Sequence, residues 1–270
     1  PFGGNQLAVI PVASGIPEEQ LQKIAREFNY SETTFVYPPV NPDHTAKVRI
    51  FTPTMEVPFA GHPTIGTAIA LRDAGHAGDM VLELGVGPIP CKFSGDTAAF
   101  TVTAPLDRLS MPDPALVAAA LGLPTAAINT STHAPVQAGV GLPFVIVEVL
   151  DAATLRACAP VIDQFRQGAA RYPLGLDFAI YAYVRDGQQI NARMFAPLDN
   201  IPEDPATGSA AAALAAMLTE TLGADQDLRI LQGETMGRPS NITASTKGGD
   251  PVAVTVSGQA VRTMQGTLVL

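Results

Sequence analysis

The stretch Arg49-Ile50-Phe51-Thr52-Pro53 returns in altered form as Arg193-Met194-Phe195-Ala196-Pro197, 144 residues later. A second match follows in the same order, because His62-Pro63-Thr64-Ile65-Gly66-Thr67-Ala68-Ile69-Ala70 is echoed 142 residues later by Asp204-Pro205-Ala206-Thr207-Gly208-Ser209-Ala210-Ala211-Ala212. In each half, an apolar strand leads through a Pro-containing loop into a Gly- and Ala-rich helix. Two ordered matches at nearly one spacing indicate an internal repeat, with a connection two residues shorter in the second half.

The helices of this repeat carry their own signals. Pro63 and Pro205 suit the first position of a helix, where the missing N–H costs nothing, and Asp204 suits the N-cap. From Ser209 to Leu218 almost every residue is Ala, Leu or Met, so this helix is apolar all round and should be buried. We therefore expect an α+β fold of two similar domains related by pseudo-twofold symmetry, each a curved sheet around a central helix.

Other segments fit this picture. A helix is predicted from Pro17 to Phe28, ended by Asn29, and a short one near Ala115 to Leu121, after a linker at Ser110 to Pro114. Strands are predicted at Thr34–Tyr37, Lys47–Phe51, Met80–Leu84, Ala99–Thr103, Phe144–Val149, Phe178–Val184, Gln189–Met194, Val252–Val256 and Thr267–Leu270.

The composition narrows the range of partners. The chain has 270 residues and a formal net charge of −9, which disfavours binding to nucleic acid or to an anionic membrane surface. No apolar run is long enough for a membrane span, and no signal peptide is visible. Cys91 and Cys158 form no metal-binding or redox pattern, so we expect a reducing cytoplasm. The chain begins at Pro1 without an initiator Met, so we expect a segment upstream.

Two helix N-termini would face each other if the halves pack symmetrically, and each offers free N–H groups to a carboxylate. His62 lies at the N-terminus of one helix and Asp204 at the N-terminus of the other. We expect the two to approach each other across a cleft, with a protonated His62 balancing an ionised Asp204. Glu32 begins an apolar strand, and burial in a closing cleft would raise its pKa toward neutrality and suit it to acid–base work.

No metal or organic cofactor is expected. The four histidines show no ligand spacing, and we expect His44, His76 and His133 at the surface. Gly139-Val140-Gly141 lacks the rest of a dinucleotide fingerprint, and neither a phosphate-binding loop nor a nucleophile elbow is present.

Several segments resemble the phenazine-biosynthesis PhzF-like isomerase family, in the family's order along nearly the whole chain. They are Asn29-Tyr30-Ser31-Glu32-Thr33, Arg49-Ile50-Phe51-Thr52-Pro53, Pro58-Phe59-Ala60-Gly61-His62-Pro63-Thr64-Ile65-Gly66-Thr67-Ala68, Glu203-Asp204-Pro205-Ala206-Thr207-Gly208-Ser209-Ala210 and Gln232-Gly233-Glu234-Thr235-Met236-Gly237-Arg238-Pro239-Ser240. The resemblance implies a diaminopimelate-epimerase-like fold with domains at 1–108 and 109–257, and a C-terminal strand at 258–270 that returns to the first domain.

The resemblance also implies an activity: a cofactor-independent proton shift within a small cyclic amino or hydroxy acid, as in trans-2,3-dihydro-3-hydroxyanthranilate isomerase. By this resemblance Glu32 is the acid–base residue, and His62 and Asp204 flank a small anionic substrate. The implied substrate-binding residues are Ser31, Gly61, Thr207, Gly208 and Ser209. Family members are commonly homodimers.

The chain departs from the family at its start. The family's opening strand is missing before Pro1, and its usual Gly-Asn-Pro reads Gly4-Asn5-Gln6. The roles of Asn5 and Arg238 are left open. The first alternative is a two-base racemase or epimerase, but that chemistry needs a thiol at each central helix, where this chain has His62 and Asp204. The second is a non-catalytic scaffold that binds a metabolite, which the presence of Glu32, His62 and Asp204 disfavours.

Overall fold

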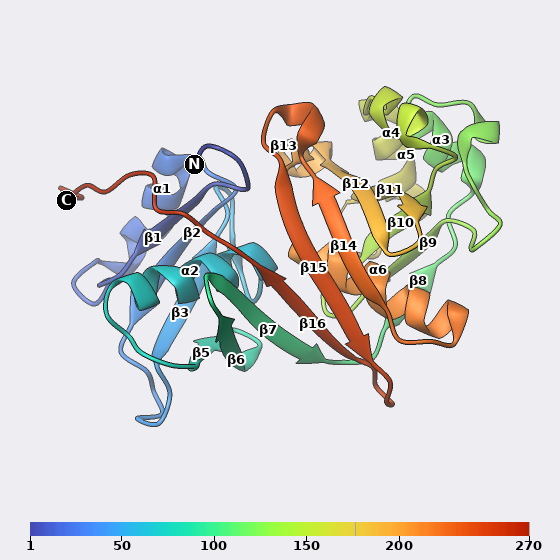
Figure 1. The fold of residues 1–270 in the computed structure, drawn as a ribbon. Coiled ribbons are helices and arrows are strands. Elements are labelled where there is room, and N and C mark those ends of the chain that lie inside the picture. Colours follow the sequence, from blue (N-terminus) through green and yellow to red (C-terminus); the bar gives the residue numbers. More distant parts are fainter. Residues whose placement is uncertain (176, 270) are drawn as a thin grey trace. The chain divides into compact units, whose positions relative to one another are not determined.

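The computed structural model describes residues 1–175 and 177–269, which divide into two compact units. Unit 1 comprises Pro1–Phe100 with Ser257–Leu270, and unit 2 comprises Thr101–Val256 (Figure 1). Each unit combines a mixed β-sheet with helices, as the α+β prediction requires. We describe each unit by itself.

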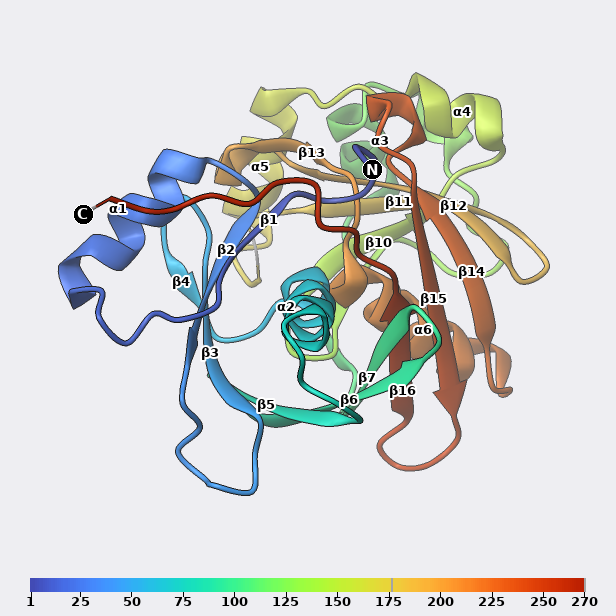
Figure 2. The ribbon, with the colours of Figure 1, turned by 60° about the vertical axis from the view of Figure 1, so that its left-hand side comes forward.

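Unit 1 curves its sheet around helix α2 (Gly61–Asp73), while α1 (Glu18–Phe28) packs its apolar side on the outer face of the sheet. The strands are β1 (Leu7–Ile10), β2 (Glu32–Tyr37), β3 (Ala46–Phe51), β4 (Glu56–Val57), β5 (Met80–Leu84), β6 (Gly87–Ser94) and β7 (Thr97–Thr103). Their order is β1-β2-β3-β5-β6-β7, with β4 paired to the end of β3. Figure 2 looks nearly along α2 and shows these strands bending around it.

The sequence of α2 explains why strands can surround it. Its residues from Gly61 to Leu71 are mostly buried and lie on all sides of the helix. A Cβ at Gly66 would lie 2.5 Å from a methyl carbon of Leu7, so a larger residue there would require the Leu7 side chain of β1 to shift. On another side, the hydroxyls of Thr67 and Thr34 lie 2.9 Å apart and tie the helix to β2. Small side chains on all sides of α2 therefore leave room for the strands that surround it.

Unit 2 repeats the theme around helix α6 (Gly208–Leu222), which is buried from Gly208 through Thr219. Its strands are β8 (Asp107–Ser110), β9 (Val136–Gly139), β10 (Phe144–Glu148), β11 (Ile180–Asp186), β12 (Gln189–Ala196), β13 (Ile201–Asp204), β14 (Asp227–Gln232), β15 (Ser240–Lys247) and β16 (Ala253–Gly258). The order is β16-β15-β14-β12-β11-β10-β9-β8, with β13 paired to β12.

Short helices cover the other face of this sheet (Figure 1). They are α3 (Pro114–Ala120), α4 (Ala152–Ala157) and α5 (Ile162–Arg171), and single helical turns lie at η1 (Thr125–Ala127), η2 (Pro197–Asp199) and η3 (Glu234–Met236). Their apolar side chains form a core cluster with Val145, Ile180 and Phe195 of the strands. The alternation of strand side chains leaves Tyr181 and Met194 on the opposite face, which α6 covers.

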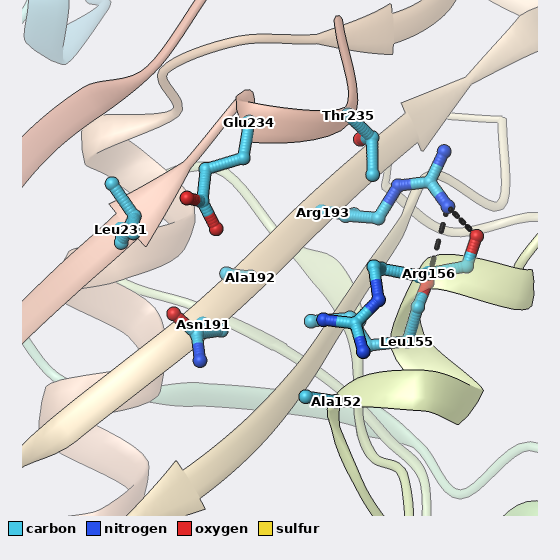
Figure 3. A pocket seen from close by; sticks show the side chains of 9 residues that line it. All are labelled: Ala152, Leu155, Arg156, Asn191, Ala192, Arg193, Leu231, Glu234 and Thr235. Carbon is cyan, nitrogen blue, oxygen red and sulfur yellow. Dashed lines mark hydrogen bonds between the residues drawn. The ribbon is translucent and has the colours of Figure 1, made fainter.

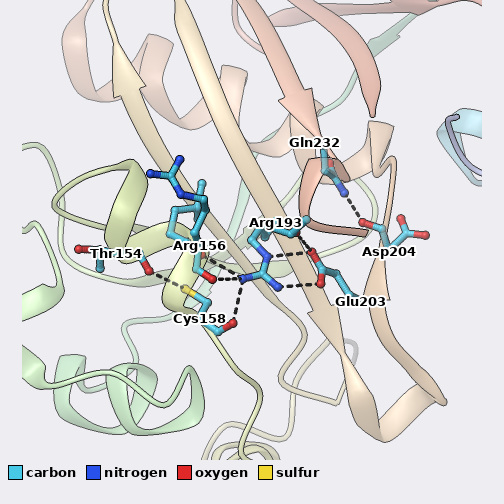
Figure 4. Close-up of polar contacts among 9 residues, drawn as sticks. Thr154, Arg156, Cys158, Arg193, Glu203, Asp204 and Gln232 are labelled. Atoms are coloured by element: carbon cyan, nitrogen blue, oxygen red, sulfur yellow. Dashed lines mark hydrogen bonds and ion pairs between the residues drawn. The ribbon is translucent and has the colours of Figure 1, made fainter. Parts of the chain in front are cut away.

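The repeat extends to side-chain contacts. Arg49 donates from Nε and Nη2 to the two carboxylate oxygens of Glu56, at 2.8 and 2.6 Å. Arg193 donates from the same two atoms to Glu203, at 2.8 and 2.7 Å (Figure 4). Each guanidinium also lies over the ring of the phenylalanine two residues on, with its carbon 5.1 and 4.7 Å from the ring centroid. Both copies thus pin the short strand after the repeated segment to the strand before it.

The structure corrects how the two copies align. Helix α2 begins at Gly61 and α6 at Gly208, so the connection is three residues longer in the second half, not two residues shorter. Counted from these starts, the counterpart of His62 is Ser209, and the counterpart of Asp204 is Val57. The extra residues form the turn η2 and lengthen β13 relative to β4.

The predicted roles at the helix starts are therefore wrong. Pro63 is the third residue of α2, and Pro205 precedes α6. Asp204 ends strand β13, and Thr207 occupies the N-cap position that the sequence suggested for Asp204. An Asp-Pro pair can end a strand as readily as begin a helix, because proline lacks the N–H that would extend the ladder.

The predicted C-terminal strand is also not formed in the described residues. Strand β16 ends at Gly258, and residues 259–269 have no regular structure. Val261, Met264 and Val269 are exposed there, so the apolar residues that suggested a strand at Thr267–Leu270 are not covered by a partner that would order them. Leu270 lies outside the described residues.

The two repeated ion pairs differ in burial and should differ in stability contribution. The Arg193 and Glu203 side chains are 10% and 15% exposed, and Arg193 Nη1 also donates to the carbonyls of Leu155, Arg156 and Cys158. We expect Arg193→Met to lower the free energy of unfolding by about 3–5 kcal/mol, because it leaves a buried carboxylate unbalanced. The matched change Arg49→Met, beside a more exposed pair, should cost about 1 kcal/mol or less.

Urea unfolding of the two variants measures this difference. The double variant with Arg193→Met and Glu203→Leu should be more stable than Arg193→Met alone, because it removes the orphaned charge. Equal losses for Arg193→Met and Arg49→Met would contradict the assignment.

Candidate functional site

Glu32 is positioned by the start of strand β2. Asn29 adopts a left-handed conformation at φ 50°, which ends α1 as predicted and turns the chain toward the sheet. Glu32 then pairs in parallel register with Leu7 of β1. The next two residues, Thr33 and Thr34, are fully buried, so the strand is anchored directly behind the carboxylate.

His62, the second residue of α2, lies beside this carboxylate. Its Nε2 atom is 3.3 Å from Oε2 of Glu32, and each side chain is only 16% exposed. The two atoms do not have the geometry of a hydrogen bond. The structure therefore brings two of the predicted catalytic residues together within unit 1.

Asn5 connects this pair to Ser31. The Ser31 hydroxyl donates to Oδ1 of Asn5 at 2.8 Å, and Nδ2 of Asn5 lies 3.3 Å from Nδ1 of His62. Ser31 was predicted to bind substrate, and here it holds the asparagine that holds the histidine. The sequence left the role of Asn5 open, and the only signal for it was the partial Gly-Asn pattern at Gly4-Asn5.

Burial decides the charge of His62. Loss of solvent lowers its pKa to about 4, although a backbone hydrogen bond to Gln6 acts in the opposite direction. Burial thus favours the neutral imidazole near pH 7, whereas the sequence suggested a protonated His62, and its pairing with Asp204 stays a prediction.

Asp204 has its own network in unit 2. It is 6% exposed at the end of β13, and the Thr207 hydroxyl donates to its Oδ2 at 2.6 Å. Gln232 donates from Nε2 to the Asp204 carbonyl at 2.7 Å (Figure 4) and to the Thr207 hydroxyl at 2.9 Å. The backbone N–H of Thr207 returns a hydrogen bond to Oε1 of Gln232. The structure thus brings together two of the predicted site residues, because the Thr207 hydroxyl donates directly to the Asp204 carboxylate.

Gln232 belongs to this network, although the sequence assigned it no role. It is 1% exposed at the end of β14, and Gly233 follows with φ 78°. A Cβ on Gly233 would lie 2.4 Å from the carbonyl oxygen of Arg238 and 2.9 Å from that of Pro205. Only glycine permits this close packing, which sets the end of β14 against the loop that carries Asp204.

The first turns of both buried helices have N–H groups that lack an acceptor within the helix. In α2 the first intrahelical bond comes from Thr64 to Ala60, and in α6 it comes from Ala211 to Thr207. The N–H groups of Gly61 and His62, and of Gly208 and Ser209, therefore have no acceptor within their helices. Such groups suit an anion, and all four were named by the sequence analysis.

The cysteines and His133 lie elsewhere. Cys91 is buried in β6 and Cys158 is buried at the end of α4, and burial raises their pKa values to about 12 and about 11, so both are thiols near neutral pH. His133 is half-buried rather than at the surface as predicted, because it stacks on Tyr183 and hydrogen-bonds to its hydroxyl at 2.7 Å.

Two cavities are separate from these residues. One, of about 40 Å³, has room for only a few water molecules and lies between α4 and the strands β12 and β14 (Figure 3). The other, of about 200 Å³, lies in unit 1. Arg193 lines the first and its counterpart Arg49 lines the second. The two cavities thus lie at equivalent positions of the repeat, and residues of α4 line only the one in unit 2.

Within the part of the chain that is described, no group of three or more His, Cys, Asp or Glu side chains could hold a metal ion. Among the same residues, no helix has both the length and the apolar character that crossing a membrane requires.

The sequence matches the family model described as "Phenazine biosynthesis-like protein" over residues 1–266. An uncharacterized isomerase from Mesorhizobium japonicum is 39% identical over 99% of this chain and 94% of its own length. Trans-2,3-dihydro-3-hydroxyanthranilate isomerase from Pseudomonas aeruginosa is 36% identical over 98% of this chain and 94% of its own length. The crystal structure of a PhzF-family phenazine biosynthesis protein from Bacillus anthracis shares the fold, with a TM-score of 0.84 at 22% identity, over 96% of this chain and 91% of that one.

The low pKa of His62 predicts how stability depends on pH. The free imidazole titrates near 6.5 and the folded one near 4, so between these values the unfolded chain binds more protons and stability falls as the pH falls. From pH 7 to pH 4, His62 alone should remove about 3 kcal/mol from the free energy of unfolding. Between pH 7 and pH 4, the free energy of unfolding of the variant His62→Gln should fall by about 3 kcal/mol less than that of the parent protein. Urea unfolding measures both.

The exposed His76 supplies the control, because His76→Gln should keep the pH dependence of the parent protein. If the curves of His62→Gln and the parent run parallel, His62 is not held neutral by burial.

Proposed function

This chain belongs to the phenazine biosynthesis-like protein family and is an isomerase, and we propose that it moves a proton within a small cyclic amino or hydroxy acid with Glu32 as its acid and base. The proposal rests on one observation above all. Glu32 is a mostly buried side chain whose Oε2 lies 3.3 Å from Nε2 of the equally buried His62.

This environment suits proton transfer by a carboxyl group. A catalytic carboxyl must give up and regain a proton in a setting with little water, so that the transfer is directed to the substrate. A protonated histidine would hold Glu32 permanently as the anion, whereas neutral His62 adds no charge. Asn5 and Ser31 fix the ring of His62, which in turn limits the positions open to Glu32.

The reaction balances without an external reagent. The Glu32 carboxylate takes a proton from one carbon of the substrate, and the electron pair of that C–H bond shifts through the adjacent double bond. The resulting Glu32 carboxylic acid returns the proton to a second carbon. The substrate changes only in the positions of one hydrogen and one double bond, so nothing is oxidised or reduced.

The remaining predicted residues serve binding. The N–H groups at the start of α2, at Gly61, and those at the start of α6, at Gly208 and Ser209, each suit the carboxylate of a small anionic metabolite. Asp204, held by Thr207, accepts from a donor such as an amino or hydroxyl group of the substrate. That His62 and Asp204 contact one substrate remains a prediction, as do the homodimer and the cytoplasmic location.

The alternatives predict different behaviour. A two-base racemase needs a thiolate beside each buried helix, and both thiols of this chain lie elsewhere with raised pKa values. A non-catalytic scaffold would bind candidate acids without exchanging hydrogen. Incubation in D₂O with cyclic amino and hydroxy acids, followed by mass spectrometry, separates the isomerase from the scaffold.

Glu32→Gln tests the assignment of the base. The amide keeps the shape of the side chain but cannot accept the proton, so kcat should fall about 10²- to 10⁴-fold. Thermal unfolding should change little. His62→Gln and Asp204→Asn should reduce kcat less, because neither residue transfers the proton. Near-normal turnover of Glu32→Gln would move the role of base to another residue.

Metal removal tests the cofactor prediction. Dialysis against a chelator should leave the rate of isomerisation unchanged, because the proposed chemistry uses only side chains and backbone N–H groups. A loss of rate that a divalent ion restores would show that a metal takes part.

A further inference from the structure

The hydrogen bonds of the Gln232 side chain have fixed directions. Its Nε2 atom lies 2.7 Å from the carbonyl oxygen of Asp204, which can only accept (Figure 4), and its Oε1 atom lies 3.3 Å from the backbone nitrogen of Thr207, which can only donate. These two backbone groups determine which end of the amide is nitrogen and which is oxygen. The side chain is also 1% exposed, so its partners are protein groups rather than bulk water.

This orientation of the amide decides what the Thr207 hydroxyl can do. Nε2 of Gln232 donates its other proton to Oγ1 of Thr207 at 2.9 Å. The hydroxyl therefore accepts from Gln232, and its single proton goes to Oδ2 of Asp204 at 2.6 Å. The three residues form a chain of hydrogen bonds with one direction, which ends on a carboxylate that accepts. We call them the Asp204 network.

Helix α6 does not use Thr207 in the ordinary way. Thr207 is the N-cap residue, where a threonine hydroxyl usually accepts a hydrogen bond from an N–H group of the first turn. Its side chain makes no such capping bond here. The hydroxyl is directed to Asp204 instead, so its place in the network is not explained by helix stability.

Unit 1 has apolar residues at the positions of the Asp204 network. Counted from the helix starts, Val57 and Ala60 are the counterparts of Asp204 and Thr207. Leu84 ends β5 as Gln232 ends β14. The same arrangement of two strands and a helix start therefore forms without any of the three polar side chains.

A glycine contact supports this correspondence. The residue after each strand is a glycine that packs on the proline before the helix. A Cβ on Gly85 would lie 2.9 Å from Cβ of Pro58, and one on Gly233 would lie 3.0 Å from Cβ of Pro205. The backbone frame is thus shared, and burying polar groups in it costs free energy that apolar side chains would not. The network calls for an explanation beyond packing.

We propose that Gln232 is a positioning residue of the site, which acts through Thr207 to hold the Asp204 carboxylate as an acceptor and so selects ligands that present an amino or hydroxyl donor. This inference rests on the proposed function, in which Asp204 contacts the substrate. A carboxylate has about four acceptor positions, so it can accept from a ligand as well as from Thr207.

Calorimetry with two probes tests the proposal. The parent protein should bind 3-hydroxyanthranilate, which has amino and hydroxyl donors, more tightly than benzoate, which has neither. Gln232→Leu and Thr207→Val should each lower this preference about tenfold or more, because a hydrogen bond to a charged group no longer has a fixed acceptor. Thr207→Ser keeps the hydroxyl and should retain the preference.

Gln137→Leu is the matched control for the loss of a buried glutamine. Gln137 lies on β9 in the same unit and is 1% exposed; it accepts from the Ser110 hydroxyl at 2.8 Å and donates to the carbonyl of Leu174. Gln137→Leu and Gln232→Leu should both lower the thermal midpoint, by about 3 °C or more. Only Gln232→Leu should change the preference between the probes.

A double variant decides whether Gln232 acts through Thr207. Adding Gln232→Leu to Thr207→Val should lower the preference much less than Gln232→Leu does in the parent. The proposal is overturned by a parent without the preference, by Gln232→Leu or Thr207→Val retaining it, by Gln137→Leu losing it, or by additive effects in the double variant. If Gln232→Leu does not fold, the comparison of Thr207→Val with Thr207→Ser decides. Calorimetry needs no turnover, so these outcomes are independent of whether Glu32→Gln abolishes the reaction.

Discussion

Each unit depends on a helix that is buried on every side by a curved sheet. Helices α2 and α6 have no polar face, and the sheets can close on them only because their side chains are small. Gly66 illustrates the tight fit, since one added carbon would displace the end of the Leu7 side chain. A helix enclosed in this way has a fixed start, and its first N–H groups point to a fixed place. The candidate site residues are defined relative to these helix starts.

Networks of hydrogen bonds and ion pairs connect the buried core to the candidate site residues and fix their positions. In unit 2, Arg193 pins Glu203 with two hydrogen bonds, and the next residue, Asp204, points to the opposite face of β13. The ion pair on one face therefore sets the register of the carboxylate on the other. Thr207 and Gln232 then orient that carboxylate, and Gly233 permits the close packing that brings Gln232 within reach.

The two copies of the repeat keep a common frame but differ in chemistry. Both retain the Arg–Glu pair, the ring under the guanidinium and the glycine at the helix start. Unit 1 adds His62 beside Glu32, where unit 2 has Ser209. Unit 2 adds Asp204, where unit 1 has Val57. Conserving the frame keeps the anion-binding N–H groups in both halves, while each half contributes a different acid or base.

The sequence by itself indicated the repeat, the buried Gly- and Ala-rich helices, eight of the sixteen described strands to within two residues, and the candidate residues from Ser31 to Ser209. These features depend on periodicity, side-chain size and turn residues, which are local properties of the chain. It misaligned the helix starts, because Pro63 and Pro205 carry the same signal as a true first helical residue. Only the tertiary structure decided the rest. Contacts such as Asn5 with His62, or Gln232 with Asp204, join residues that lie far apart in the sequence. Burial alone made His62 neutral and left the hydroxyl of Tyr181 without a partner, because the free energy of a charge or a hydrogen bond depends on what surrounds the group rather than on its neighbours in the chain.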